Sequence, residues 1–355
     1  MMRYATDLML SVSRVVRGAG AGMASKRCLM LSLAVAVVLV GSLAACGGDG
    51  DFFPRAPARS GTGTFATRSA APPRAPVATP TPARVTPEAY QRVLTELDTA
   101  LGPGFGAIGS AQTPEDLAAA LSAVALNLTI QADGLEDVRP PAAVATAHTG
   151  LSDALGTLAA ELTSLAGDAR DREVCTGGSG LPRAASGNGG HLFRLAVLGL
   201  ATADPAHHYT VGSFLPPGAP DQTRRAGNGS LPGGRRGGYG ELTITASGGT
   251  DAVVKVLQGA DVIRNVYVQA GASAKVDGIP NGTFDVFYTE GTDWDDANHR
   301  FTRDCAFSRF DQPITFSTTN HPGSIEYTTY TLTLYGVVGG TASSTDVPPG
   351  AFPGG

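Results

Sequence analysis

Hydrophobic residues recur every three or four positions through residues 86–170, which is the period of an α-helix. Three apolar stripes can be traced, and prolines separate them. They predict a helical bundle of about three helices over residues 86–174. The stripes consist of Tyr90, Leu94, Leu97 and Leu101, then Leu117, Leu121, Val124, Leu128 and Leu135, and finally Val144, His148, Leu151, Leu155, Leu158, Leu162 and Leu165.

Capping residues mark where the first two helices begin. Thr86 and Thr113 each stand before a proline and an acid, so a hydroxyl can accept a hydrogen bond from the first turn. Gly102 and Pro103 are expected to end the first helix, because neither residue favours a helix interior.

One histidine, His148, lies on the apolar stripe of the third predicted helix. No second histidine or acid stands beside it at the spacing of metal ligands. We therefore expect a buried histidine whose ring nitrogens are hydrogen-bonded, and not a metal ligand.

After Gly240 apolar residues alternate with polar ones, which is the period of a β-strand. The alternation predicts an antiparallel β-sandwich of about seven strands over residues 240–347. Helices followed by strands assign the chain to the α+β class. The predicted strands contain the sequences ELTIT, VVKVL, VYV, AKV, TFDVFY, ITF and YTLTLY.

Glycine is dense between the two predicted domains. Residues 175–239 are expected to form a connector with one short helix, HLFRLAVLGLATA. Its arginines include Arg224 and Arg225, but the phosphate-loop pattern G-x-x-x-x-G-K-[ST] is absent, so we expect an exposed basic loop. Residues 348–355 are expected to form a flexible tail.

An uncharged apolar run occupies residues 28–45 and follows Lys26 and Arg27. A basic start, an apolar middle and a small-residue end are typical of an export signal, although the length also fits an uncleaved membrane anchor. Residues 1–45 are therefore predicted to be a signal peptide. A complete basic region begins at Met23, which we take as the translation start.

The apolar run ends in Leu43-Ala44-Ala45-Cys46. This tetrapeptide resembles the lipobox of bacterial lipoproteins. The resemblance implies that the Cys46 sulfur receives a diacylglyceryl group with acyl chains such as palmitate, and that the chain is cut before Cys46. Two acyl chains would hold the protein stably on the extracytoplasmic face of the cell membrane.

Proline, alanine, serine and threonine dominate residues 46–85, which show no hydrophobic period. Such a segment is expected to be a disordered tether that separates the lipid from the folded part.

Two further cysteines, Cys175 and Cys305, remain in the chain after Cys46. Exported proteins occupy compartments in which disulfides persist, so we predict a bond between them. The alternative is a pair of buried reduced thiols.

Sequences in the β-rich region resemble known exported domains. VDGIPNGTFDVFY is similar to a stretch of carboxypeptidase-regulatory-like and transthyretin-like sandwiches. GTDWDDANHRFTRDCAFSRFD and YGVVGGTASSTDV resemble a family of exported proteins of high-GC bacteria that has no assigned activity. Both resemblances imply a β-sandwich and neither supplies a reaction.

Carboxylates are densest at Asp293, Asp295 and Asp296. Oxygen ligands of this kind suit Ca²⁺, so these residues are a candidate calcium site. The EF-hand pattern is not met, and the alternative is an acidic loop between strands.

No sequence pattern of a nucleophile, a zinc site or a cofactor site is recognisable. The chain has 26 Lys and Arg against 31 Asp and Glu, a formal charge of −5, so we expect no nucleic-acid partner. We predict a surface-displayed structural or interaction module of the cell envelope, without cofactor, that contacts a cell-wall polymer or an envelope protein. The alternative is an envelope hydrolase or processing enzyme whose site is not visible in the sequence. Convergence of His299, Asp293 or Asp295 and a serine in one pocket would favour it.

Overall fold

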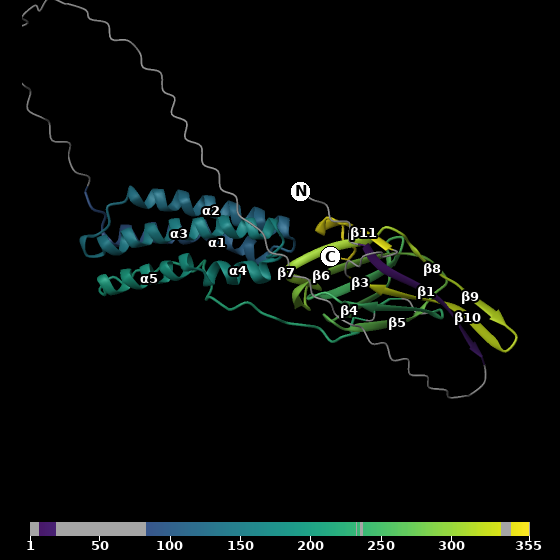
Figure 1. Ribbon diagram of the computed structural model, residues 1–355. Coiled ribbons are helices and arrows are strands. Elements are labelled where there is room, and N and C mark those ends of the chain that lie inside the picture. Colours follow the sequence, from purple (N-terminus) through teal and green to yellow (C-terminus); the bar gives the residue numbers. More distant parts are fainter. Residues whose placement is uncertain (1–6, 19–82, 232, 235–236, 335–341, 355) are drawn as a thin grey trace, which may run out of the picture. The chain divides into compact units, whose positions relative to one another are not determined.

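The fold was analysed in a computed structural model (Figure 1), and the described residues form one compact unit. Met23, the apolar run, Cys46 and nearly all of the predicted tether lie outside them. From residue 83 onward helices precede strands, which confirms the α+β class. The described ranges are 7–18, 83–231, 233–234, 237–334 and 342–354.

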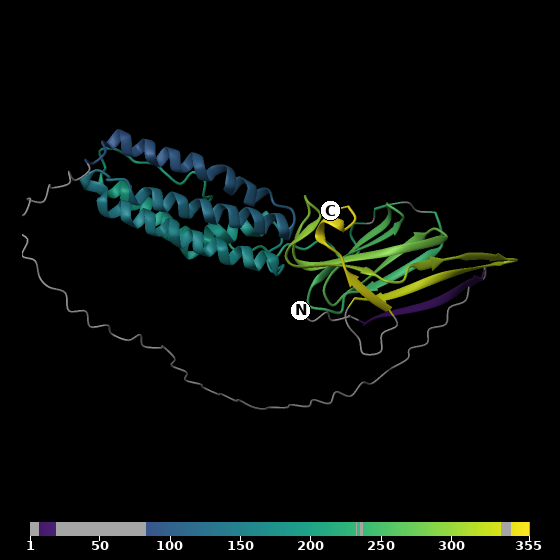
Figure 2. The same cartoon turned by 90° about the horizontal axis from the view of Figure 1, so that it is seen from above.

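Five α-helices form the first part of the described chain after residue 83. They are α1 (Pro87–Ser110), α2 (Pro114–Glu136), α3 (Ala145–Arg170), α4 (Gly177–Ser186) and α5 (Asn188–Ala203), with a short 3₁₀ turn at Ala142–Val144 before α3. The hydroxyls of Thr86 and Thr113 accept hydrogen bonds from the amides of Ala89 and Asp116, which confirms both predicted helix starts. α2 packs against α1 and α3, and α3 packs against α5 (Figure 2).

The predicted end of the first helix is wrong, because α1 continues through Pro103 to Ser110. Two apolar residues beyond the proline, Phe105 and Ile108, are 2% and 0% exposed. Burying each of them contributes about 1.5–3 kcal/mol. That gain offsets the roughly 3 kcal/mol that a proline costs inside a helix.

The connector contains two helices instead of the single one predicted, because α4 occupies residues that were expected to form a loop. Its first residue, Gly177, donates its amide to the Ala111 carbonyl over 2.8 Å. A Cβ atom at Gly177 would lie 2.1 Å from the Ile108 carbonyl oxygen. Glycine here allows the start of α4 to lie directly against the end of α1 and does not mark a loop.

His148 is buried in the helical core, as predicted, and is 6% exposed. Its Nδ1 lies 3.0 Å from the Tyr90 hydroxyl and its Nε2 lies 2.9 Å from the Leu135 carbonyl oxygen. The carbonyl can only accept, so Nε2 carries the proton and Nδ1 accepts from Tyr90. Burial lowers the pKa of His148 because it disfavours the charged imidazolium, although the Leu135 carbonyl acts in the opposite direction.

We expect acid to weaken the fold through His148. An unfolded histidine titrates near pH 6.5, and the folded pKa is lower, so the unfolded state binds more protons between the two values. The contribution is complete above about pH 6.5 and is lost as the pH falls towards the folded pKa. His148→Gln should be less stable at pH 7.5, and the difference from wild type should shrink by pH 5 in urea unfolding. A constant difference would contradict this assignment.

Among the described residues the β-rich part has eleven strands, ten of them within residues 240–347, where about seven were predicted. They are β1 (Asp7–Gly18), β2 (Gly240–Thr245), β3 (Asp251–Gln258), β4 (Asp261–Val268), β5 (Ser273–Ile279), β6 (Gly282–Asp295), β7 (Arg300–Phe310), β8 (Ile314–Phe316), β9 (Thr318–His321), β10 (Ser324–Thr333) and β11 (Ala342–Asp346). The seven predicted segments correspond to β2–β6, β8 and β10. β7, which carries charged residues among its aromatic ones, has too irregular an alternation to be recognised.

The strands follow the order β4-β3-β6-β7-β11-β1-β10-β2-β5, with β8 on β6 and β9 on β10. β11 and β1 share only two residue pairs, so the path divides there into two sheets. All pairings are antiparallel except that of β10 with β2. One hydrophobic cluster formed by the strands includes Val254, Val286, Phe316 and Leu332.

Both ends of the described chain differ from the sequence analysis. β1 lies within residues 1–45, which were assigned to the signal peptide, yet it pairs with β10 (Figures 1 and 2). The segment predicted to be a flexible tail forms a 3₁₀ turn at Pro349–Ala351, and Phe352 is 7% exposed. The Lys255 ammonium holds this segment by donating to the carbonyls of Pro353 and Gly354.

Among the described helices, α2 is long and apolar enough to cross a membrane by length and composition. Leu117, Leu121, Val124 and Leu128 of α2 are all at most 3% exposed and belong to the helical core. A buried core helix meets the same criteria of length and composition, and α2 is packed as a core helix.

Candidate functional site

A disulfide joins the segment between α3 and α4 to β7. Cys175 and Cys305 lie with sulfur atoms 2.07 Å apart and Cα atoms 6.3 Å apart, which confirms the predicted bond. The backbone pairs at the same place, since the amide of Cys175 donates to the Thr302 carbonyl over 2.8 Å. The two parts of the chain are therefore tied at one point by covalent and hydrogen bonds.

Asp293 lies beside this point and its side chain is 1% exposed. It accepts hydrogen bonds from the Arg224 guanidinium at 2.8 Å and from the Thr302 hydroxyl at 2.6 Å. Thr302 in turn lies 2.5 Å from the Ser179 hydroxyl of α4. Burial opposes ionisation of Asp293, but the bonds from Arg224 and Thr302 outweigh it and lower the pKa.

The three residues of the candidate calcium site do not share a centre. Asp293 binds Arg224, Asp295 accepts from Asn298 at 2.7 Å, and Asp296 accepts from the Trp294 indole at 3.2 Å. Within the described ranges, no group of three or more His, Cys, Asp or Glu side chains is arranged to hold a metal ion. The geometry is that of an acidic segment at the end of β6, whose carboxylates accept hydrogen bonds from Arg224, Trp294 and Asn298.

The expected basic loop is only half exposed at its first two arginines, with side chains 46% and 47% exposed. Arg225 binds Asp251, which also accepts from the Tyr267 hydroxyl and, at 2.7 Å, from the Ala270 amide. Arg224 binds Asp293 in the same forked way. These two adjacent arginines therefore bind the connector to two buried carboxylates. The glycine-rich sequence around the arginines gave no indication of this role.

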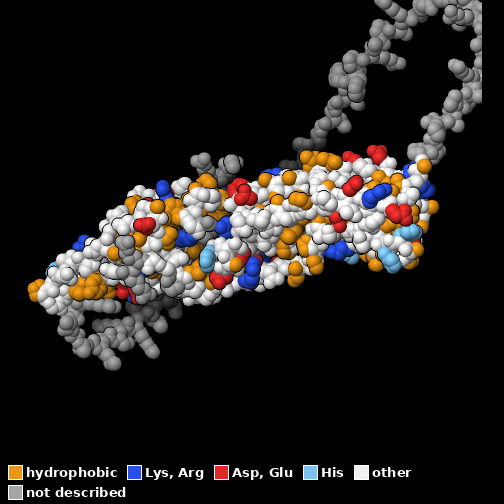
Figure 3. Space-filling model, turned by 180° about the vertical axis from the view of Figure 1, so that it is seen from behind, with side chains coloured by type: hydrophobic (Ala, Val, Ile, Leu, Met, Phe, Trp, Pro, Cys, Tyr) orange, Lys and Arg blue, Asp and Glu red, His pale blue; other side chains and the backbone are white. Residues whose placement is uncertain are grey.

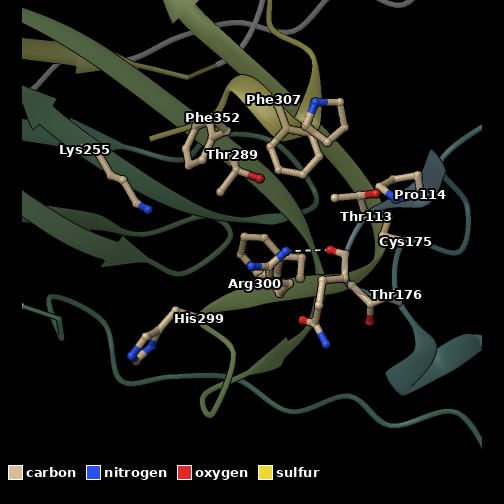
Figure 4. Close-up of a pocket in the computed structure, with 13 residues that line it drawn as sticks. Thr113, Pro114, Cys175, Thr176, Lys255, Thr289, His299, Arg300, Phe307 and Phe352 are labelled. Atoms are coloured by element: carbon tan, nitrogen blue, oxygen red, sulfur yellow. Dashed lines mark hydrogen bonds between the residues drawn. The ribbon is translucent and has the colours of Figure 1, made fainter. Parts of the chain in front are cut away.

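A cavity of about 20 Å³ lies next to the disulfide (Figure 4). Figure 4 shows Lys255 and Phe352 on one side, Thr113 on the other, and the Arg300 guanidinium reaching the Gln112 carbonyl, at 2.6 Å. Burial lowers the pKa of Lys255 to about 8. The volume holds about one water molecule and no substrate.

The hydrolase alternative would be favoured if His299, Asp293 or Asp295 and a serine met in one pocket. His299 lines the small cavity, but the residues around it include no aspartate and no serine. Asp293 is directed towards Arg224 and Thr302 instead. Neither Asp293 nor Asp295 is among the described residues that line the cavity beside His299, and Asp295 accepts from Asn298.

A much larger hollow, of about 630 Å³, lies on the outer face of β2, β5 and β10. Tyr239, 50% exposed, stands at its edge, and its ring centre is 6.1 Å from that of the buried Tyr327. Lys275 and Glu241 form an ion pair of 2.7 Å along the floor, beside Asp277.

A second hollow, of about 310 Å³, adjoins the first. Asn281, Thr318 and Asn320 line it, and the segment 237–239 borders both hollows. The half-exposed Tyr239 therefore borders two adjoining, shallow polar depressions. We call this surface, with Tyr239, Glu241, Lys275, Asp277, Asn281 and Asn320, the Tyr239 groove.

The Tyr239 groove combines an exposed aromatic face with carboxylate, ammonium and amide groups. A ring of this kind can pack against an apolar ligand face, while the polar groups exchange hydrogen bonds with hydroxyls or amides. The groove could not be predicted from the sequence, because its residues come from three strands, β2, β5 and β9, and from two loops. The one sequence signal was a lone tyrosine in the glycine-rich segment GGYG.

Charges are mixed on the molecule. On the face seen in Figure 3, acidic and basic side chains are interspersed and form no extended field of one sign. This face therefore has no basic patch of the kind that binds nucleic acid, and the formal charge of the chain is −5.

No protein-family model, no curated protein and no solved structure matches the chain. The resemblances to lipoproteins and to exported sandwich domains therefore stay predictions, and function has to be argued from the geometry.

Proposed function

We propose that this chain is a lipid-anchored protein of the cell envelope that binds a hydroxyl-rich envelope polymer, a glycan, in the Tyr239 groove. The observation that carries the proposal is the half-exposed Tyr239 ring beside two adjoining polar hollows. Two adjacent depressions bordered by an aromatic ring suit successive units of a chain molecule better than one small substrate.

In the proposed arrangement the helices form a bundle and the sheets form a sandwich that presents the groove. Cys46 carries the lipid, residues 46–85 act as the tether, and the folded part stands away from the extracytoplasmic surface. A glycan is favoured over a protein partner at this groove because the floor is polar and charged, whereas protein interfaces centre on a desolvated apolar patch.

The anchor is tested at Cys46, whose thiolate is the acceptor of the lipid in this proposal. Cys46→Ser should leave the precursor uncut and unlabelled by a radiolabelled fatty acid, and the wild type should be labelled. Cys28→Ser is the matched control, since it removes a cysteine at the start of the apolar run and should label normally. Labelling of the Cys46→Ser protein would overturn the lipoprotein assignment.

The groove is tested with the mature protein and solubilised cell-wall glycan in isothermal titration. Tyr239→Ala should weaken binding about tenfold, because loss of the ring contact removes about 1.4 kcal/mol. Tyr239→Phe keeps the ring face and should bind within about threefold of wild type, a difference of about 0.65 kcal/mol. Asn320→Ala in the second hollow should weaken binding of long fragments more than of short ones.

Unchanged glycan binding by Tyr239→Ala would exclude this groove as the site. A change of glycan during the titration, seen as new reducing ends, would favour the hydrolase alternative. Far-ultraviolet circular dichroism of each variant checks that the fold is retained, as expected for an exposed side chain.

A further inference from the structure

β1 is bound along the full length of one edge of β10. Ten residue pairs join the two strands without a register shift, from Met9 opposite Thr333 to Gly18 opposite Ser324. Figures 1 and 2 both show β1 beside β10. The Thr329 hydroxyl adds a bond of 3.1 Å to the Ser13 carbonyl.

The opposite edge of β10 is already occupied. β2 pairs with Thr329–Thr333 and β9 pairs with Ser324–Tyr327. β11 meets β1 at only two pairs and does not pair with β10 within the described residues. β1 is thus the strand that covers this side of β10.

β1 also covers apolar surface. Leu10 lies opposite Leu332 and packs, partly buried, against the hydrophobic cluster that contains Leu332. Further along, Arg14 lies 3.4 Å from Glu326. A strand in this position therefore contributes backbone bonds, an apolar side chain at the core and a positive charge near Glu326.

The position of β1 in the sequence conflicts with the proposed maturation. β1 ends at Gly18, before the apolar run, so a cut before Cys46 removes it from the protein. The mature chain would then have a ten-residue edge with unpaired amides and carbonyls. Folded proteins rarely leave such an edge open, and β10 contains no proline, lysine or bulge that would block pairing.

We propose that the β10 edge of the mature protein is an acceptor site for an extended segment of a partner protein. The inference rests on the proposed cut before Cys46. The segment adds as a strand antiparallel to β10, with alternating apolar residues towards the core and a basic residue near Glu326. A second β10 is the poorer occupant, because the strand has no Lys or Arg to meet Glu326.

The probe is a synthetic peptide of residues 7–18, DLMLSVSRVVRG, added to the mature protein purified from the envelope in detergent. Mass spectrometry first establishes the N-terminus of that protein. We expect saturable binding of one peptide per chain by fluorescence anisotropy. No glycan is present, so the result does not depend on the Tyr239 groove.

Matched controls use backbone methylation. One peptide is N-methylated at the residues corresponding to Leu10, Val12 and Arg14, and a second at those corresponding to Ser11, Ser13 and Val15. Amides of alternate residues point to opposite edges of a strand, so only one of the two sets faces β10. One methylated peptide should have a dissociation constant at least tenfold higher than that of the unmodified peptide. The dissociation constant of the other should lie within about threefold of the unmodified value.

Three results would overturn the inference. The first is failure of the unmodified peptide to bind a protein that starts at Cys46 and is folded by circular dichroism. The second is a mature protein that is a stable dimer by light scattering and is dissociated by the peptide, which would make a second copy the occupant. The third is detection of residues 7–18 in the envelope protein, which would also refute the proposed cut and leave glycan binding unaffected.

Discussion

Replacement of both Cys175 and Cys305 by alanine is expected to lower the free energy of unfolding by about 3–5 kcal/mol. The bond joins residues 130 positions apart and so restricts a long loop in the unfolded chain. Both cysteines are at most 3% exposed, and alanine at both positions leaves no unpaired polar group. Urea unfolding of the double variant and the wild type measures the difference.

Chemical reduction measures the contribution of the disulfide to stability separately from the packing of the two side chains. Wild type treated with a strong reductant after partial unfolding should reach the stability of the double variant, and the double variant should not respond to reductant. Equal stability of oxidised and reduced wild type would show that the bond contributes nothing. Free thiols at both positions in protein taken from the envelope would contradict the bond itself.

The second large effect is expected at Asp293. Asp293→Ala should destabilise the fold by about 2–3 kcal/mol, because it removes a buried carboxylate that binds the half-exposed Arg224 and leaves the fully buried Thr302 hydroxyl with one partner fewer. Asp293→Asn should cost less, since the amide oxygen still accepts and asparagine tolerates the positive φ of 58° at this position. Urea unfolding at pH 7 compares the variants.

Asp296→Ala is the matched control in the same turn. Its side chain is exposed and accepts only from the Trp294 indole, so the expected loss is below about 1 kcal/mol. Addition of Ca²⁺ should leave the melting temperature of the wild type unchanged, because the Asp293 oxygens already have donors. A rise that disappears in Asp293→Asn would restore the calcium hypothesis.

Features that depend on neighbouring residues could be predicted from the sequence. A hydroxyl before a proline and an acid sets a helix start by contacts within one turn, so Thr86 and Thr113 could be assigned directly. Strands such as β2 have one face in the core and one in solvent, which produces the alternation seen in GELTIT. The disulfide followed from cysteine number and predicted export, without knowledge of the fold.

Features that depend on distant residues were not readable. Pro103 ends a helix by its own chemistry, and only the burial of Phe105 in the core explains why α1 continues. In the sequence the glycines around Gly177 indicate a loop. The structure shows instead that they allow α4 to lie directly against α1. The pairs Arg224–Asp293 and Arg225–Asp251 join residues 69 and 26 positions apart, so no spacing in the sequence connects them.

The sequence alone determined the α+β class, the helix starts and most strand positions, because each depends on neighbours along the chain. Tertiary structure decided that Asp293 binds Arg224, that Tyr239 borders two hollows and that β1 pairs with β10. Each of these depends on which segments lie together in space, and free energies of burial and pairing, which local sequence does not encode, determine that arrangement.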